Sequence, residues 1–218
     1  MQDRATLLYG QDPTERIVAV ERVGRSHVRV FRRLHDDRVV AESAPFHPWA
    51  VLTEEGAGAL DRRGAEIVRL QGDLPLRYLA RFVSWNAFRA AIEQIQQRGY
   101  PVHTFGHPTD QYLTLTGRNL FRGMDFDDIV RMQIDIETTG FDARSNRAEI
   151  LVVALSTNRG RREVLDVADL GEAGVLQTLT ERIQQIDPDV IEGHNLFNFD
   201  LPFLIERARQ HGVTLAWG

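Results

Sequence analysis

Residues 131–138 read RMQIDIET, and this stretch decides the fold of the second half of the chain. Apolar and polar residues alternate throughout it, which predicts a half-buried β-strand. Asp135 and Glu137 are two residues apart, so their side chains project from the same face, roughly 7 Å apart at the backbone. Like charges on one face repel unless solvent or cations neutralise them. The pair therefore indicates either a cation site or a plain exposed acidic face.

The residues that follow this strand predict an α/β arrangement. The pattern favours strands over 150–155 and 162–167, a turn at 158–160, a helix over 175–186, a short strand at 190–191 and a last helix from Asp200 to Gly212. The order β-β-β-α-β-α is that of a ribonuclease H-like fold.

A second informative stretch is GHNLFNFDLP, at residues 193–202. The short strand ends at Gly193, a tight loop follows, and Asp200 opens a helix with Pro202 in its first turn. Asp200 could be a plain helix N-cap, and Asn195 could be a turn residue. Those alternatives explain one residue each. They do not explain why Asp200 follows Asp135 by 65 positions, with the strands and helix of a ribonuclease H-like fold between them.

The two stretches together carry a resemblance to a known family. Asp135-Ile136-Glu137-Thr138 resembles the first exonuclease motif of family B DNA polymerases, and Asn195-x3-Phe199-Asp200 resembles the second. Residues 120–124, LFRGM, are similar to the corresponding lead-in of bacterial members. The motif-level match covers roughly residues 110–212. The resemblance implies a DEDD-type, proofreading 3′–5′ exonuclease that acts on the 3′ end of single-stranded DNA.

The resemblance also implies roles for particular residues. The catalytic and metal-binding residues would be Asp135, Glu137 and Asp200, three of four carboxylates around two divalent cations, Mg²⁺ or Mn²⁺. One cation would help deprotonate and aim a water, and the other would stabilise the departing 3′-oxygen. The residues that hold the single-stranded 3′ end would be Thr138, Asn195 and Phe199, although Phe199 could instead belong to the core.

The family's third motif, a Tyr followed four residues later by an Asp, has no counterpart here. After Asp200 the sequence contains neither residue. We therefore expect an incomplete exonuclease domain, cut before the third motif, that is weakly active or inactive alone. The remaining polymerase domains of a parent protein would be its partners.

The chain is expected to divide into three parts: a β-rich N-terminal domain over 1–105, a connecting segment over 106–130, and the exonuclease domain over 131–218. In the first part the pattern predicts strands over 17–23, 28–34, 39–46, 65–70 and 76–83, and a helix that Ser84 caps and Gly99 ends. His103 and His107 have a spacing that suits metal binding on a helix. We expect a loop there, so a metal site is not predicted.

Composition limits the classes of function. The chain has no cysteine, which excludes disulfide frameworks, zinc ribbons and thiol nucleophiles. Residues 1–130 hold 17 arginines and 17 acidic residues, whereas residues 131–218 hold 9 arginines and 14 acidic residues. An acidic balance fits a site whose cations meet phosphate better than it fits a simple DNA-binding module. With no signal peptide and no apolar run long enough for a bilayer, we expect a cytoplasmic protein without membrane contact.

Two other classes of function remain open. One is a stand-alone exonuclease of the wider Asp-Glu-Asp-Asp group, acting in repair or RNA processing. The other is a non-catalytic nucleic-acid-binding domain that keeps the first two motifs. Metal-dependent stabilisation would separate the second alternative from a nuclease.

Overall fold

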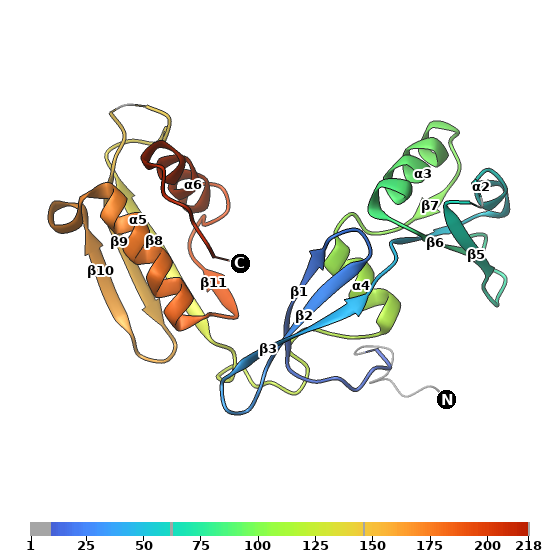
Figure 1. The fold of residues 1–218 in the computed structure, drawn as a ribbon, viewed down its shortest axis with the longest axis horizontal. Helices are drawn as coiled ribbons and strands as arrows, with labels where there is room; N and C mark the ends of the chain where they lie inside the picture. The colour runs from blue at the N-terminus through green and yellow to red at the C-terminus, as the bar shows by residue number, and fades with distance from the viewer. Residues whose placement is uncertain (1–9, 62, 146, 218) are drawn as a thin grey trace. The chain divides into compact units, whose positions relative to one another are not determined.

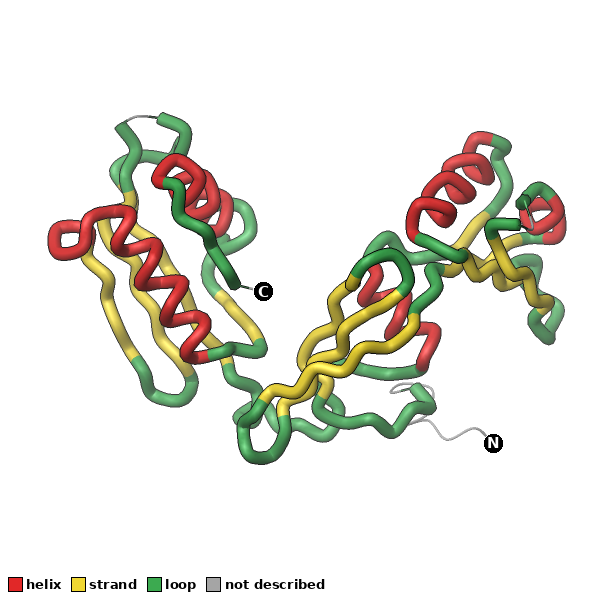
Figure 2. The backbone as a smooth tube through the Cα atoms, viewed as in Figure 1, coloured by secondary structure: helices red, strands yellow, loops and turns green. Residues whose placement is uncertain are grey.

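The computed structural model of the protein describes residues 10–61, 63–145 and 147–217. The chain divides into two compact units, Met1–Gly123 and Met124–Gly218. Both units combine helices with β-sheets (Figures 1 and 2), and each has its own cluster of buried apolar side chains.

The first unit contains two antiparallel sheets, with strand orders β1-β2-β3 and β5-β6-β4-β7. Its elements are β1 Ile17–Val23, β2 His27–Arg33, β3 Val39–Pro45, β4 Trp49–Leu52, α2 Glu54–Gly58, β5 Ala65–Arg69, β6 Tyr78–Phe82, α3 Trp85–Gln97, β7 Val102–His103 and α4 Pro108–Thr116. The five strands predicted from alternation are present. The structure adds α2, α4 and the short strands β4 and β7.

Helix α3 begins where its sequence predicts. The hydroxyl oxygen of Ser84 accepts a hydrogen bond from the backbone N–H of Ala87, 3.2 Å away, which is an N-cap. Phe88 and Ile95 are buried in the core of the unit. The helix stops before Gly99, whose φ of 71° is left-handed.

The predicted connecting segment, 106–130, contains helix α4. Pro108 is accepted in the first turn, where no intrahelical N–H is needed, and Gly117 ends the helix with a left-handed φ of 69°. The side chain of Gln111 is fully buried and accepts a hydrogen bond from the N–H of Trp49, 2.9 Å away. Much of the predicted connection is therefore part of the first unit's core.

The second unit contains one four-stranded sheet of order β10-β9-β8-β11. Its elements are β8 Arg131–Thr138, β9 Ile150–Thr157, β10 Arg162–Asp166, α5 Val167–Ile186, β11 Val190–Glu192 and α6 Asp200–His211. Strand β11 runs parallel to β8, and the other pairs are antiparallel. The predicted element order is confirmed. Helix α5 begins earlier than predicted and is interrupted at Gly171, where φ is 68° and ψ is 159°.

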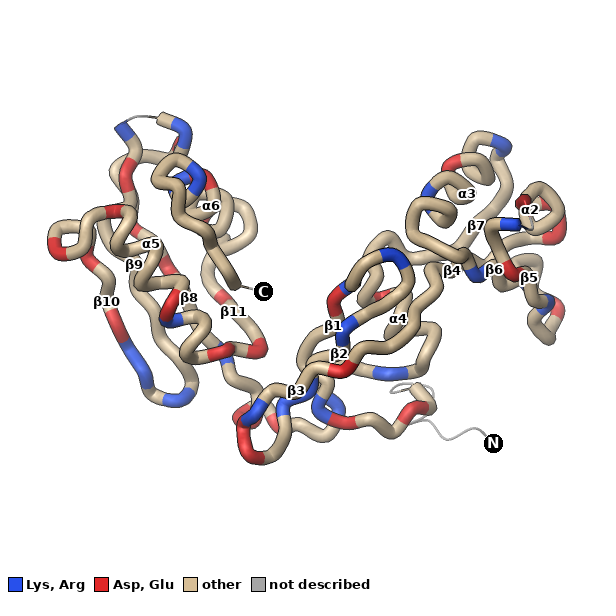
Figure 3. Tube along the Cα trace, in the orientation of Figure 1, with Lys and Arg blue, Asp and Glu red and all other residues tan. Residues whose placement is uncertain are grey.

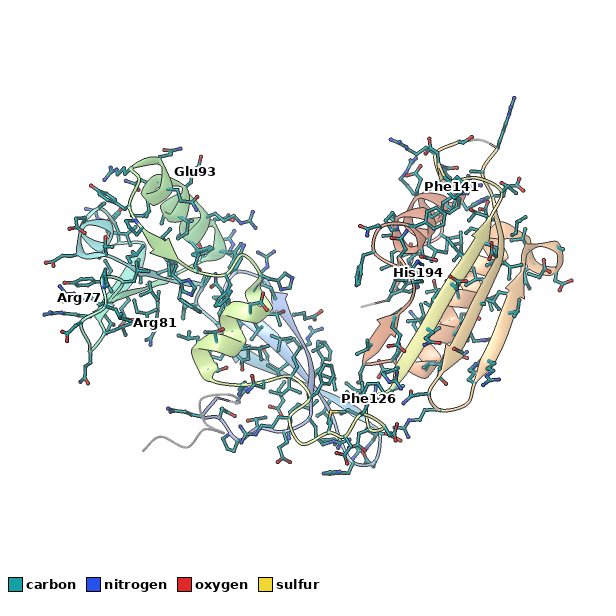
Figure 4. All side chains as sticks on the ribbon, turned by 180° about the vertical axis from the view of Figure 1, so that it is seen from behind. Arg77, Arg81, Glu93, Phe126, Phe141 and His194 are labelled. Carbon is teal, nitrogen blue, oxygen red and sulfur yellow. The ribbon has the colours of Figure 1, made fainter. Side chains whose placement is uncertain are left out.

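The two helices lie on one face of this sheet. Ile134 and Ile136 of β8 are buried against an apolar cluster that includes Leu176 of α5 and Leu204 of α6. Figure 4 shows the opposite face, with α5 behind the strands. In the part of the unit that the structure describes, this second face has no helix over it. We call it the open face.

Charged residues are spread over both units, as Figure 3 shows. In the second unit they include acidic positions on β8 and arginines at the turn between β9 and β10. Across the described ranges, no helix combines the length and the hydropathy needed to cross a membrane.

Candidate metal and nucleic-acid site

Strand β8 presents two carboxylates on the open face. Burial alternates strictly from Met132 to Glu137, so Asp135 and Glu137 are exposed while their neighbours Ile134 and Ile136 are buried. The sequence pattern predicted this arrangement. It leaves both acidic side chains next to each other on one surface.

Asp200 brings a third carboxylate to the same strand. Its Oδ1 accepts a hydrogen bond from the backbone N–H of Ile136, 3.2 Å away, and the residue is only 2% exposed. Ile136 lies between Asp135 and Glu137. The bond therefore attaches Asp200 to the backbone of β8 at the residue between the two exposed acids.

The end of β11 makes this contact possible. Glu192 is the last residue of β11 and pairs with Gln133, so the strand stops before it reaches Ile136. The N–H of Ile136 on that edge is then free to bond a side chain. Asp200 is the first residue of α6, where the helix dipole favours a negative charge. The N-cap position is Phe199, so the interpretation of Asp200 as a plain N-cap is wrong.

A tight turn between β11 and α6 places Asp200. A Cβ on Gly193 would lie 2.5 Å from the carbonyl oxygen of Ile134, so only glycine allows the two backbones to approach this closely. Asn195 has a left-handed φ of 55°, and its carbonyl accepts hydrogen bonds from the N–H groups of Asn198 and Phe199, at 3.1 and 3.0 Å. Asn195 is therefore a turn residue in this structure, and its side chain is exposed.

The other two predicted nucleic-acid contacts lie close to the carboxylates. Thr138 follows Glu137 at a β-bulge, and its hydroxyl donates a hydrogen bond to the carbonyl of Gly140, 2.8 Å away. Phe199 is half-buried, with its ring centroid 6.1 Å from that of Phe141 and 5.6 Å from that of Phe203. Phe199 thus contributes to the core and also has an accessible edge.

The carboxylates are of a type that binds divalent cations, but their side chains are not gathered around one point in this structure. Carboxylate oxygens are the ligands that Mg²⁺ and Mn²⁺ prefer. However, among the residues that the structure describes, no three His, Asp or Glu side chains are gathered closely enough to hold an ion. One oxygen of Asp200 is directed at a backbone N–H instead.

His194 is a neighbour of Asp135 that the sequence did not single out. The last parallel pair of β11 and β8 is Glu192 with Gln133, and His194 and Asp135 each follow that pair by two residues in the chain. Both line a hollow of about 780 Å³ on the open face. Figure 4 labels His194. His194 comes near Asp135 through the pairing of β11 with β8, which the sequence does not reveal, so sequence reasoning did not find it.

A smaller hollow of about 270 Å³ lies beside Phe199, between the loop after β8 and helix α6. Its wall includes Phe141, Arg144 and Glu206. Hydrogen bonds from Arg209 and Gln210 lower the pKa of Glu206 to about 2, so this carboxylate stays ionised at neutral pH. Phe141 is 93% exposed, which leaves an aromatic face open to solvent.

Comparison with known proteins finds similar chains among DNA polymerases. The model of the family described as "DNA polymerase family B, exonuclease domain" matches residues 158–216, which include the turn and Asp200. DNA polymerase 2 of Aeropyrum pernix is 28% identical over 219 residues, covering 94% of this chain and 25% of that polymerase. The DNA polymerase delta catalytic subunit of Dictyostelium discoideum is 49% identical over 39 residues, covering 18% of this chain and 4% of the relative.

A solved structure supports the fold. The family B DNA polymerase of the hyperthermophilic archaeon Pyrobaculum calidifontis matches with a TM-score of 0.55 and 20% identity, over 90% of this chain and 32% of that chain. The chain is therefore homologous to the exonuclease region of family B DNA polymerases, with archaeal polymerases among its relatives. It spans about a quarter of the length of DNA polymerase 2 of Aeropyrum pernix. The predicted resemblance to bacterial members stays a prediction.

Proposed function

We propose that residues 131–218 form the 3′–5′ exonuclease part of a family B-type DNA polymerase, with a ribonuclease H-like fold and a proofreading role. The observation that carries the proposal is the hydrogen bond from Ile136 to Asp200, which ties a carboxylate of α6 to the backbone of β8 beside Asp135 and Glu137. Homology to polymerase exonuclease domains supports the same activity. The substrate would be the 3′ end of single-stranded DNA.

The residues that would hold two divalent cations, Mg²⁺ or Mn²⁺, are Asp135, Glu137 and Asp200. Cations bound there would supply an activated water and offset charge on the departing oxygen. The protein's own part is to fix the oxygens. Strand β8 sets the spacing of Asp135 and Glu137, and the N–H of Ile136 holds one oxygen of Asp200.

The residues that would hold the DNA strand are Thr138, Asn195 and Phe199. The ring of Phe199 could stack against a terminal base, an interaction that suits any sequence. The exposed amide of Asn195 can both donate and accept hydrogen bonds. Thr138 directs its hydroxyl proton to Gly140, which leaves the oxygen as an acceptor.

The test is cutting of a 5′-labelled single strand by excess protein in Mn²⁺, so that slow turnover is detected. We expect products shortened one nucleotide at a time from the 3′ end, and no shortening of a strand whose 3′ linkages are phosphorothioates. Asp135→Asn should abolish the products, whereas Asp110→Asn, an exposed acid of the first unit, should not. Internal cuts, or products that persist in Asp135→Asn, would contradict the proposal.

One observation favours a second candidate, a non-catalytic nucleic-acid-binding domain. Within the described residues no three acidic or histidine side chains enclose an ion site. Such a domain would bind single-stranded DNA without Mn²⁺ and would cut nothing. Comparing DNA binding in Mn²⁺ and in a chelator separates the two candidates, because a nuclease site needs cations between its carboxylates and the phosphate.

A further inference from the structure

Helix α6 carries a buried ion pair that the proposed chemistry does not use. The side chains of Arg207 and Glu172 are 8% and 7% exposed. Arg207 Nε donates to Glu172 Oε1 at 2.7 Å, and Arg207 Nη2 contacts Glu172 Oε2. Glu172 also bonds the N–H of Ile150, at 2.9 Å, and Nε2 of His211, at 2.6 Å. Each oxygen of this carboxylate therefore has two hydrogen-bond partners.

Glu172 joins three elements of the second unit. It lies on α5 directly after the break at Gly171, and it bonds the first residue of β9 and two residues of α6. The left-handed φ of Gly171 redirects the chain, so that Glu172 opens the continuous part of α5. A negative charge is favoured at such a helix start.

Arg207 and Asp200 lie on the same face of α6. They are seven residues apart, which is about two helical turns, and both are buried. Asp200 bonds the backbone of β8 through Ile136, and Arg207 is tied through Glu172 to the backbone of β9. Helix α6 is thus attached to β8 through Asp200 and to β9 through Arg207, from the same face of the helix.

The buried pair suits a role in orientation better than a role in stability. Removing two charges from water costs nearly as much as their attraction returns, so a well-packed apolar pair would hold α6 equally firmly. An apolar pair would not fix rotation or axial position, because hydrophobic contacts are non-directional. The four hydrogen bonds of Glu172 are directional.

We propose that Glu172 is a positioning residue that acts through Arg207 to fix the rotation and axial position of α6, and hence the carboxylate of Asp200 against Ile136. The expected effect on cation binding rests on the proposed function. The placement of Asp200 does not, because it concerns only the hydrogen bond from the N–H of Ile136 to Asp200.

The amide proton of Ile136 reports the placement directly, since its exchange with solvent depends on the bond to Asp200. In Glu172→Gln/Arg207→Met the glutamine can still accept from the N–H of Ile150, so the bond to β9 is kept while the ion pair is removed. We expect the Ile136 amide to exchange about tenfold faster than in the native chain, with less than about a twofold change at the other amides of β8. Equal changes along β8 would show a merely structural role and overturn the proposal.

The matched control is Glu163→Gln/Arg182→Met. That pair, at 2.9 Å, also ties α5 to the sheet, but it bonds β10 and does not touch α6. This control should leave the exchange rate of the Ile136 amide unchanged relative to the other amides of β8. Glu172→Gln alone is the second variant if the double variant does not fold, and it should show the same selective effect at Ile136. An unaltered Ile136 amide in a folded Glu172→Gln would contradict the proposal.

Mn²⁺ affinity, followed by the loss of the free-ion paramagnetic resonance signal, is the second readout. The Glu172→Gln/Arg207→Met variant should bind Mn²⁺ about tenfold more weakly. If the native chain binds no Mn²⁺ while Ile136 responds as expected, the proposed function fails and the positioning role stands. If Mn²⁺ binds natively and Ile136 does not respond, the positioning role fails.

Discussion

At the scale of single residues, Asp200 has two separable roles, as an acceptor for a backbone N–H and as a charge. Asp200→Asn keeps an oxygen that can accept from Ile136 and removes the charge. Asp200→Ala removes both and leaves a buried N–H without a partner, which costs about 1–3 kcal/mol. We therefore expect Asp200→Ala to be less stable than Asp200→Asn by about this amount, measured by urea unfolding. Equal stability of the two variants would mean that the bond to Ile136 contributes nothing.

The positions of the candidate site residues were predictable only where a local pattern marks them. Alternation placed Asp135 and Glu137 on one face of a strand, and the residues around Asp200 placed it at a helix start. Their roles at a cation site come from the resemblance and stay predictions. The bond between Asp200 and Ile136 was not predictable, because it depends on where β11 stops along β8. The special roles of Gly193 and His194 depend on the same register.

At the scale of elements, the hydrogen bonds of Glu172 to Arg207, His211 and the N–H of Ile150 make the stability of the second unit depend on pH. Burial raises the pKa of Glu172, but hydrogen bonds from Arg207, the N–H of Ile150 and His211 outweigh burial and hold the pKa below the ordinary 4.5. A lowered folded-state pKa stabilises the fold above the unfolded-state value, and this contribution is lost as pH falls through the folded-state value.

Glu172→Gln removes that contribution. The variant should unfold at lower urea concentration than the native chain at pH 7, and the difference should shrink as pH falls below about 4.5. Breaking one side of a buried ion pair costs about 3–5 kcal/mol, which sets the upper end of the difference at neutral pH. A difference that grows on acidification would show the sign of the linkage to be wrong.

Elements with strong periodicity were predicted, and weakly patterned ones were not. Strand β8 and helix α3 have clear alternation or capping, and both were found. Strand β4 is only four residues long, and helix α4 starts at a proline in a stretch read as loop. The pairing of Glu172 with Arg207 spans 35 residues and belongs to no motif, so only the fold reveals it.

At the scale of the whole molecule, the separate cores give each unit its own basis for stability. The acidic excess of the chain falls within residues 131–218, where 14 acidic residues face 9 arginines. The three carboxylates at β8 and α6 are among those 14 acidic residues. Cations held there would offset it locally.

The most direct test of this account is a calorimetric titration of the 218-residue chain with Mn²⁺. The three variants Asp135→Asn, Glu137→Gln and Asp200→Asn should each weaken binding about tenfold or more, as expected when a ligand of a shared site is removed. Asp110→Asn should bind as the native chain does. Native affinity that none of the three variants changes, or no Mn²⁺ binding at all, would contradict a shared cation site.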